Sequence, residues 1–328
     1  MDEAFRSTVD PACLHRPPLA MDMIKQLDTF EFSLYLILTF MSCVSLLLYL
    51  EQCAFLYKKQ SYPMKTTIIW VSGAAPIIAT MACLGMWFPR ATMFTDMTSN
   101  CYFAVVVYRF FVLMVEEFGG STAFLKRFSG KPFMINTGPC CCCCPCLPQV
   151  PMSRRMLFLL NLAGLQYAIL RTAFSVFCII LWTNGIYDLT NLSATSATLW
   201  INLSVGVLTI ISLWPVGIIF MNLRSLLRSV KFIPKYSMYQ LVFVLSQLQS
   251  SIINILAING QIACAPPLSS QARGTMLTQK LMIMEMFIIS VVNYFLYRRI
   301  YDPLPAEEHD NEENDKAALQ AALEEHDV

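Results

Sequence analysis

The thiols of this chain are concentrated in one short run. The stretch TGPCCCCCPCLP, residues 137–148, contains Cys140, Cys141, Cys142, Cys143, Cys144 and Cys146. Such a run offers three kinds of chemistry: disulfide bonds, metal ligation, or attachment of an acyl chain to sulfur. Zinc sites separate their cysteines by roughly two to four residues so that four ligands converge on one ion. Five adjacent cysteines do not meet that spacing, and no histidine is near.

A second set of reactive side chains lies inside long apolar stretches. Its members are ionisable: Glu51, Arg109, Glu116, Glu117, Arg171 and Glu285. Such groups are costly within a membrane and usually face a protein interior or water. Arg171 and Arg109 lie near the middle of their stretches, too deep to reach an interface by snorkelling. Either arginine is suited to receive an anion, and either is equally suited to pair with one of the glutamates.

Polar residues near these arginines extend the candidate site. Gln166 and Tyr167 precede Arg171 by about one helical turn, and residues four apart share a helix face. A stripe at spacing three or four runs along a later segment, with Gln247, Ser250, Ser251 and Asn254. This stripe indicates either hydrogen bonding between helices or the lining of a route. The candidate substrate-binding residues are Arg171, Gln166, Arg109, Gln247, Asn254 and Glu285.

No catalytic set is apparent. His15, His309 and His326 all lie in the terminal segments, so no His-centred triad or metal site within the apolar stretches is expected. The pattern GxxxxGK[ST] of ATP-driven proteins is missing. We therefore expect no enzyme activity, no cofactor and no metal. A carrier built this way runs down the gradient of its substrate or borrows an ion gradient.

The elements that position these residues follow from hydropathy. The chain has 328 residues, of which 56% are hydrophobic and 14% charged, and its net charge of +1 gives no reason to expect a nucleic-acid partner. Its apolar blocks approach the ~20 residues that a helix needs to cross a bilayer. They cover residues 32–57, 67–88, 100–118, 157–182, 198–221, 238–258 and 276–297. None alternates like a barrel strand, so we predict an all-α polytopic membrane protein with seven transmembrane helices. Pro76 and Pro215 are expected to kink the second and fifth helices.

Loop charge predicts the orientation. With the N-terminus outside, the inner segments 58–66, 119–156, 222–237 and 298–328 hold fifteen lysines and arginines, and the outer segments hold six. This distribution follows the positive-inside rule. We therefore predict an extracellular arm over 1–30 without a cleaved signal peptide, a seven-helix domain over 31–300, and an acidic, disordered cytoplasmic tail over 301–328.

The orientation assigns a chemistry to each group of cysteines. The cysteine run lies in the predicted inner loop 119–156, where stable disulfides are unusual. S-palmitoylation is the preferred interpretation, and simple packing of small residues at the membrane surface is the alternative. On the outer side, Cys13, Cys101 and Cys264 allow one disulfide. We favour Cys13–Cys264, because both lie in polar segments with prolines. The sequon at Asn191 falls in an outer loop and is a candidate for glycosylation.

Several long strings resemble one known family. GPCCCCCPC (138–146), NGQIACAPPLSSQARGT (259–275), ATLWINLSVGVLTIISLWPVGII (197–219) and NGIYD (184–188) are similar to the alpha subunit of the organic solute transporter, and so are MVEEFGG (114–120) and LEQCAFLYK (50–58). The resemblance extends from about residue 12 to residue 299. It does not include the tail after Tyr301.

The resemblance implies a function that hydropathy does not. It implies a bidirectional, facilitative carrier of bile acids, conjugated steroids such as estrone sulfate and dehydroepiandrosterone sulfate, and prostaglandins. It also implies a single-span beta subunit, needed for stability and for delivery to the plasma membrane, and a basolateral location in epithelia. The alternative is a seven-span receptor or a scaffold. Against a receptor, no arginine follows Glu116 and Glu117, and the seventh block lacks an Asn-Pro pair.

Overall fold

The computed structural model describes residues 19–59, 64–135, 149–185, 197–229, 232–264 and 268–298. Within them, seven helical spans are long and apolar enough to cross a membrane: Thr29–Lys59, Met64–Trp87, Pro89–Glu116, Arg154–Thr183, Thr198–Asn222, Ile233–Ile258 and Ser270–Arg298. The predicted all-α, polytopic class is confirmed. The side of the membrane on which each terminus lies stays a prediction.

Three of the spans are built from more than one element. The single helices are α3 (Thr29–Lys59), α8 (Arg154–Thr183), α9 (Ala197–Asn222) and α13 (Ser270–Arg298). The second span is α4 (Met64–Ser72) with α5 (Ala74–Trp87), and the third is the turn η2 (Pro89–Ala91) with α6 (Thr92–Glu116). The sixth is α11 (Ile233–Phe243), the π-helix η3 (Val244–Gln249) and α12 (Ser250–Ile258).

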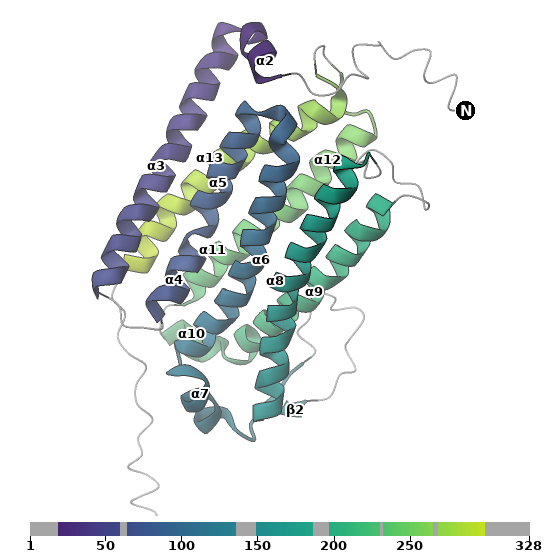
Figure 1. The fold of residues 1–328 in the computed structure, drawn as a ribbon. Helices are drawn as coiled ribbons and strands as arrows, with labels where there is room; N and C mark the ends of the chain where they lie inside the picture. The colour runs from purple at the N-terminus through teal and green to yellow at the C-terminus, as the bar shows by residue number, and fades with distance from the viewer. Residues whose placement is uncertain are drawn as a thin grey trace, which may run out of the picture.

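The spans form a bundle around α6 (Figure 1). Helices α3, α5 and α13 lie on one side of α6, and α8 and α9 lie on the other. One end of the bundle carries α7 (Gly120–Phe128), α10 (Arg224–Ser229) and the two-stranded sheet of β1 (Pro132–Phe133) and β2 (Val150–Pro151). The other end carries α2 (Ala20–Gln26). We call the first of these the α7 end.

Small residues allow the close contact between α5 and α13. Ala75, Ala79 and Ala82 are buried on one face of α5, and on α13 Ile283 and Met286 are completely buried. Small side chains let helix backbones approach closely, which is how helices associate where lipid provides no hydrophobic driving force. By contrast, α3 leaves large apolar side chains such as Phe40 exposed, as a surface facing lipid requires.

The second span is interrupted at Gly73. Pro76 has no N–H to donate to the carbonyl of Ser72, four residues back, and its ring crowds that turn. The hydroxyls of Tyr49 and Tyr102 lie against Gly73 and donate to the carbonyls of Ile69 (3.2 Å) and Trp70 (3.0 Å). The disturbance expected near Pro76 is therefore present one turn earlier. Helix α9 continues through Pro215 without a break.

Two helix starts lie earlier than hydropathy predicts. The helix α6 of the third span begins at Thr92, before Asn100. Its first turns are polar, but their hydroxyl groups form hydrogen bonds within the helix: those of Thr95 and Thr98 donate to backbone carbonyls three or four residues back. Cys101 is consequently inside α6 and not at its start. The sixth span begins at Ile233, since Pro234 suits a first helical turn. Lys235, counted above as a loop cation, is therefore a helix residue.

The segments flanking the cysteine run are attached to the α7 end. Phe118, Phe124 and Phe128 pack edge to face or tilted against one another. The Asn222 side chain accepts from the backbone N–H of Met134 (2.8 Å) and donates to its carbonyl (2.9 Å). The structure thus describes the loop 119–156 up to residue 135 and again from residue 149. The cysteine run itself lies outside the described residues.

Candidate functional site

Arg171 lies on the buried face of α8. Residues four and seven positions from it, Gly164, Tyr167, Ser175 and Cys178, are all buried. With a rise of about 1.5 Å per residue, Arg171 is roughly 18 Å from the Thr183 end of a helix 30 residues long. The prediction that Arg171 lies deep in the fourth span is confirmed. Arg171 lies on the side of α8 that packs against other helices.

The neighbours of this face belong to α6 and α9. Tyr108 of α6 contacts Gly164, at 3.6 Å from the position of an added Cβ. Thr209 of α9 donates to the Tyr167 hydroxyl (3.2 Å). Toward the other end of α8, Cys178 forms an apolar cluster with Met93 of α6 and Ile201 of α9. We call the contact of these three helices around Arg171 the α6–α8–α9 seam.

No glutamate neutralises Arg171 within the described chain. Glu51 pairs with Arg298, and Glu117 pairs with Lys235. Glu116 lies beside Arg109 and Thr67, and Glu285 lies beside Gln249. The buried Nε of Arg171 has no hydrogen-bond partner among the described residues. Of the two interpretations that the sequence left open, the pairing of Arg171 with one of these glutamates is therefore not present among the described residues.

Arg109 has a different environment. It lies in the last third of α6 and not at its middle, because that helix begins at Thr92. Its charge interacts with Glu116, seven residues on, and its guanidinium lies 6.0 Å from the ring of Tyr108. Since Tyr108 meets Gly164, Arg171 is about two turns, or roughly 10 Å, further along α8. Arg109 therefore fits the interpretation in which it pairs with a glutamate. The two arginines do not form one site.

The remaining candidates are dispersed. Gln166 is half-buried on α8. Gln247 donates to the Asn100 side chain of α6 (2.8 Å), whereas Asn254 is exposed on α12. Gln247 thus forms the hydrogen bond between helices that was one interpretation of the polar stripe. The π-helix η3, which winds more widely than an α-helix, shifts the register between Gln247 and Asn254. Glu285, half-buried on α13, does not reach Arg171.

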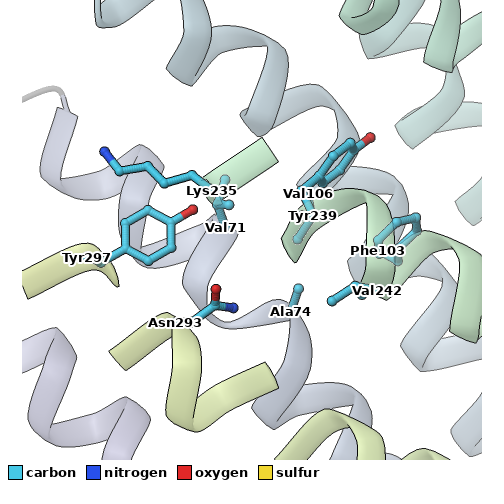
Figure 2. A pocket seen from close by; sticks show the side chains of 9 residues that line it. All are labelled: Val71, Ala74, Phe103, Val106, Lys235, Tyr239, Val242, Asn293 and Tyr297. Carbon is cyan, nitrogen blue, oxygen red and sulfur yellow. The ribbon is translucent and has the colours of Figure 1, made fainter. Parts of the chain in front are cut away.

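A separate cavity lies near the α7 end of the bundle. Its walls are Val71 and Ala74 of the second span, Phe103 and Val106 of α6, Lys235, Tyr239 and Val242 of α11, and Asn293 and Tyr297 of α13 (Figure 2). It encloses ≈ 270 Å³ of empty space including its opening, and its interior has room for about one water molecule. Asn293 Oδ1 is buried without a hydrogen-bond partner among the described residues.

Lys235 carries the charge of this cavity. Only 6% of the residue is exposed, and its Nζ lies 3.0 Å from Glu117 Oε1. The rings of Phe232 and Tyr297 are 5.3 Å and 5.4 Å from the same Nζ. In Figure 2 the lysine stem runs along the cavity, and the Tyr239 hydroxyl points away from its ammonium group. Hydropathy assigned Lys235 to a loop, so sequence reasoning missed it.

Sequence reasoning also missed a buried carboxylate near the other end of the bundle. Asp96 of α6 accepts from the Gln279 side chain of α13 (2.7 Å). Both are polar and lie outside the blocks that hydropathy selects or at their margin. The signal that would have found Asp96 is the run of threonines and serines from Thr92 to Ser99, which prolongs the third helix outward.

The covalent-site predictions fall mainly outside the described residues. This applies to Cys13, to the sequon at Asn191 and to the cysteine run. Cys264 is disulfide-bonded, and Cys101 is a free thiol. These observations are compatible with the predicted Cys13–Cys264 bond, whose pairing stays a prediction.

The fold thus defines a polytopic helical membrane protein with a half-buried arginine deep in one span that no described residue neutralises. A family model described as "Organic solute transporter Ostalpha" matches residues 34–303, and the chain belongs to this family. It is 57% identical over 319 residues to "Organic solute transporter subunit alpha" of Danio rerio, covering 97% of each chain. It is 38% identical to the human protein of the same name, covering 89% of this chain and 86% of the relative. No solved structure matches it.

Family membership settles the general role. The chain is an alpha subunit of an organic solute transporter and not an enzyme. The word subunit in the names of its relatives supports a partner chain, and the seven apolar spans support a multi-pass membrane protein.

Proposed function

We propose that this alpha subunit moves bile acids, steroid sulfates and related amphipathic organic anions across the plasma membrane, in either direction and down their gradients. We further propose that it works with a single-span beta subunit, in the basolateral membrane of epithelia. The observation that carries the substrate class is Arg171, a half-buried cation whose buried Nε has no hydrogen-bond partner among the described residues and for which none of them supplies a counter-ion.

The α6–α8–α9 seam supports an anion with an apolar body. A guanidinium has a planar fork that matches a carboxylate or sulfate with two hydrogen bonds. The Tyr167 hydroxyl, one turn from Arg171, accepts from Thr209 and keeps its own proton for a further hydrogen bond. On the other side of Arg171, two turns along α8, the Met93, Cys178 and Ile201 cluster supplies apolar side chains. A bile acid or steroid sulfate combines these two characters in one molecule.

The decisive experiment is paired expression. We expect uptake of labelled taurocholate and estrone sulfate in cells that express this chain together with a single-span beta subunit, and background uptake with either chain alone. Preloaded cells should release the same substrates when the outside concentration is low. Uptake absent under every pairing, accompanied by a signalling response to the same ligands, would instead support the alternative of a seven-span receptor or scaffold. Family membership favours the carrier.

We also propose that the α7 end faces the cytosol and that Cys140–Cys144 and Cys146 are palmitoylated. The flank before this run is bound through Met134 to Asn222 of α9, and the flank after it pairs as β2 with β1, so both flanks lie near the bundle. A buried acyl chain contributes ~0.8 kcal/mol per methylene, so two or more chains anchor the loop firmly to the inner leaflet.

Replacing these six cysteines by serine is expected to abolish labelling of the protein by a clickable fatty acid, measured after immunoprecipitation. Replacement of Cys43 and Cys53, free thiols of α3, is the matched control and should leave labelling unchanged. Labelling that persists in the six-serine variant would show that the acceptor is elsewhere. The predicted outer sites, Asn191 and the Cys13–Cys264 bond, belong to the same orientation.

A further inference from the structure

The cavity at the α7 end and the α6–α8–α9 seam lie on different faces of α6. Phe103 and Val106 face the cavity, while Tyr108 faces α8. The cavity nevertheless resembles the seam in combining apolar side chains with a positive charge. Its walls include Val71, Val106 and Val242, and Lys235 lends it a buried positive charge.

Stability alone does not account for the buried pair of Lys235 and Glu117. The two side chains are 7% and 17% exposed, so both charges have lost most of their hydration. The attraction between buried charges roughly offsets that loss, and replacing such a pair by apolar residues is often neutral or stabilising. A cation within a membrane span is by default a candidate for a functional site. The pair therefore calls for a role in binding.

We propose that Lys235 is a second anion-binding group of this carrier, which Glu117 occupies when no substrate is bound. The carboxylate or sulfate of an amphipathic substrate displaces Glu117 when it reaches the cavity. The amide of Asn293, whose Oδ1 lacks a described partner, lies on another wall of the cavity and then offers the substrate a further hydrogen bond. This inference rests on the proposed function, because it assigns to the same substrates a second binding site at the α7 end.

Occupation requires the cavity to widen. Its ≈ 270 Å³, opening included, falls below the roughly 300–1,000 Å³ of pockets for drug-sized ligands. The helix break at Gly73 lies in its wall, flanked by Val71 and Ala74. A helix terminus absorbs a backbone rotation more readily than a helix interior. The wall that must move is therefore the wall that contains the break.

Competition between Glu117 and the substrate makes the proposal testable through KM. In cells that also express the beta subunit, Glu117→Gln should lower the KM for estrone sulfate about threefold to tenfold, because a competing charge is removed. Lys235→Gln should raise KM about tenfold or more. The double variant should reach the surface normally, since no unpaired buried charge remains, and should keep the high KM of Lys235→Gln.

Glu51→Gln is the matched control, because Glu51 and Arg298 form another ion pair at this end and do not line the cavity. Its KM should equal that of the wild type. A structural pair gives another pattern: both single variants lose surface protein, and the double variant regains protein, flux and the wild-type KM. That pattern, or an unchanged KM in both single variants, overturns the proposal while the proposed function stands. If Lys235→Gln does not reach the surface, the KM of Glu117→Gln decides between the two patterns: a lowered KM supports the proposal, and an unchanged KM overturns it. If the wild-type protein shows no flux of estrone sulfate in cells that also express the beta subunit, the proposed function and this inference are rejected together.

Discussion

Replacing Arg171 by glutamine is expected to reduce kcat/KM for estrone sulfate about tenfold to a hundredfold. This range follows from the roughly 1.5–3 kcal/mol that a hydrogen bond to a charged group contributes. Because no described carboxylate pairs with Arg171, its removal leaves no orphaned charge, and the amount of protein at the surface should be unchanged. The measurement is the initial rate of uptake, normalised to biotinylated surface protein, with the beta subunit present.

Arg109 provides the matched control for Arg171. It is also a half-buried arginine in a membrane span, but Glu116 lies within reach of its charge. Arg109→Gln should therefore reduce surface protein, and adding Glu116→Gln should restore it. Arg171→Lys should retain part of the flux, since lysine keeps the charge and loses the planar fork. Full flux in Arg171→Gln would contradict the assignment of the anion site to the α6–α8–α9 seam.

Replacing Gly73 by alanine is expected to destabilise the bundle by about 1–3 kcal/mol, the usual cost of overpacking. The backbone of Gly73 is ordinary right-handed helix (φ −73°), which alanine adopts freely, so the effect is steric. An added Cβ would lie 2.4 Å from the Tyr102 hydroxyl and 2.7 Å from that of Tyr49. Both hydroxyls would have to leave the carbonyls that they now satisfy. The measurement is the thermal unfolding midpoint of the purified complex.

Gly206→Ala is the matched control for this change. Gly206 lies within α9, and no atom is within 4 Å of an added Cβ. Alanine there should raise stability slightly, since it is the better helix former by about 1 kcal/mol. Tyr102→Phe removes the nearest hydroxyl and should recover part of the stability lost in Gly73→Ala. Equal midpoints for the two alanine variants would mean that the tyrosines yield without cost.

Seven spans follow from the sequence because the cost of exposing backbone polar groups to lipid leaves little choice of structure. The same rule locates Arg171 deep in the fourth span. Hydropathy does not predict that Thr92–Ser99 and Lys235 belong to helical spans. It scores a polar residue as exposed whether or not a hydrogen bond satisfies that residue. Asp96 and Lys235 are both satisfied in this way, by Gln279 and by Glu117.

The amino-acid sequence by itself determined the class of this protein, the number of its spans and the family to which it belongs, because those depend on composition and on local strings. Only the tertiary structure decided which charges meet. Glu117 is distant from Lys235 along the chain, and Glu51 from Arg298, so no periodicity within a helix indicates either pair. Once these partners are assigned, Arg171 is left without one. That result depends on the packing of whole helices, and a linear pattern does not contain it.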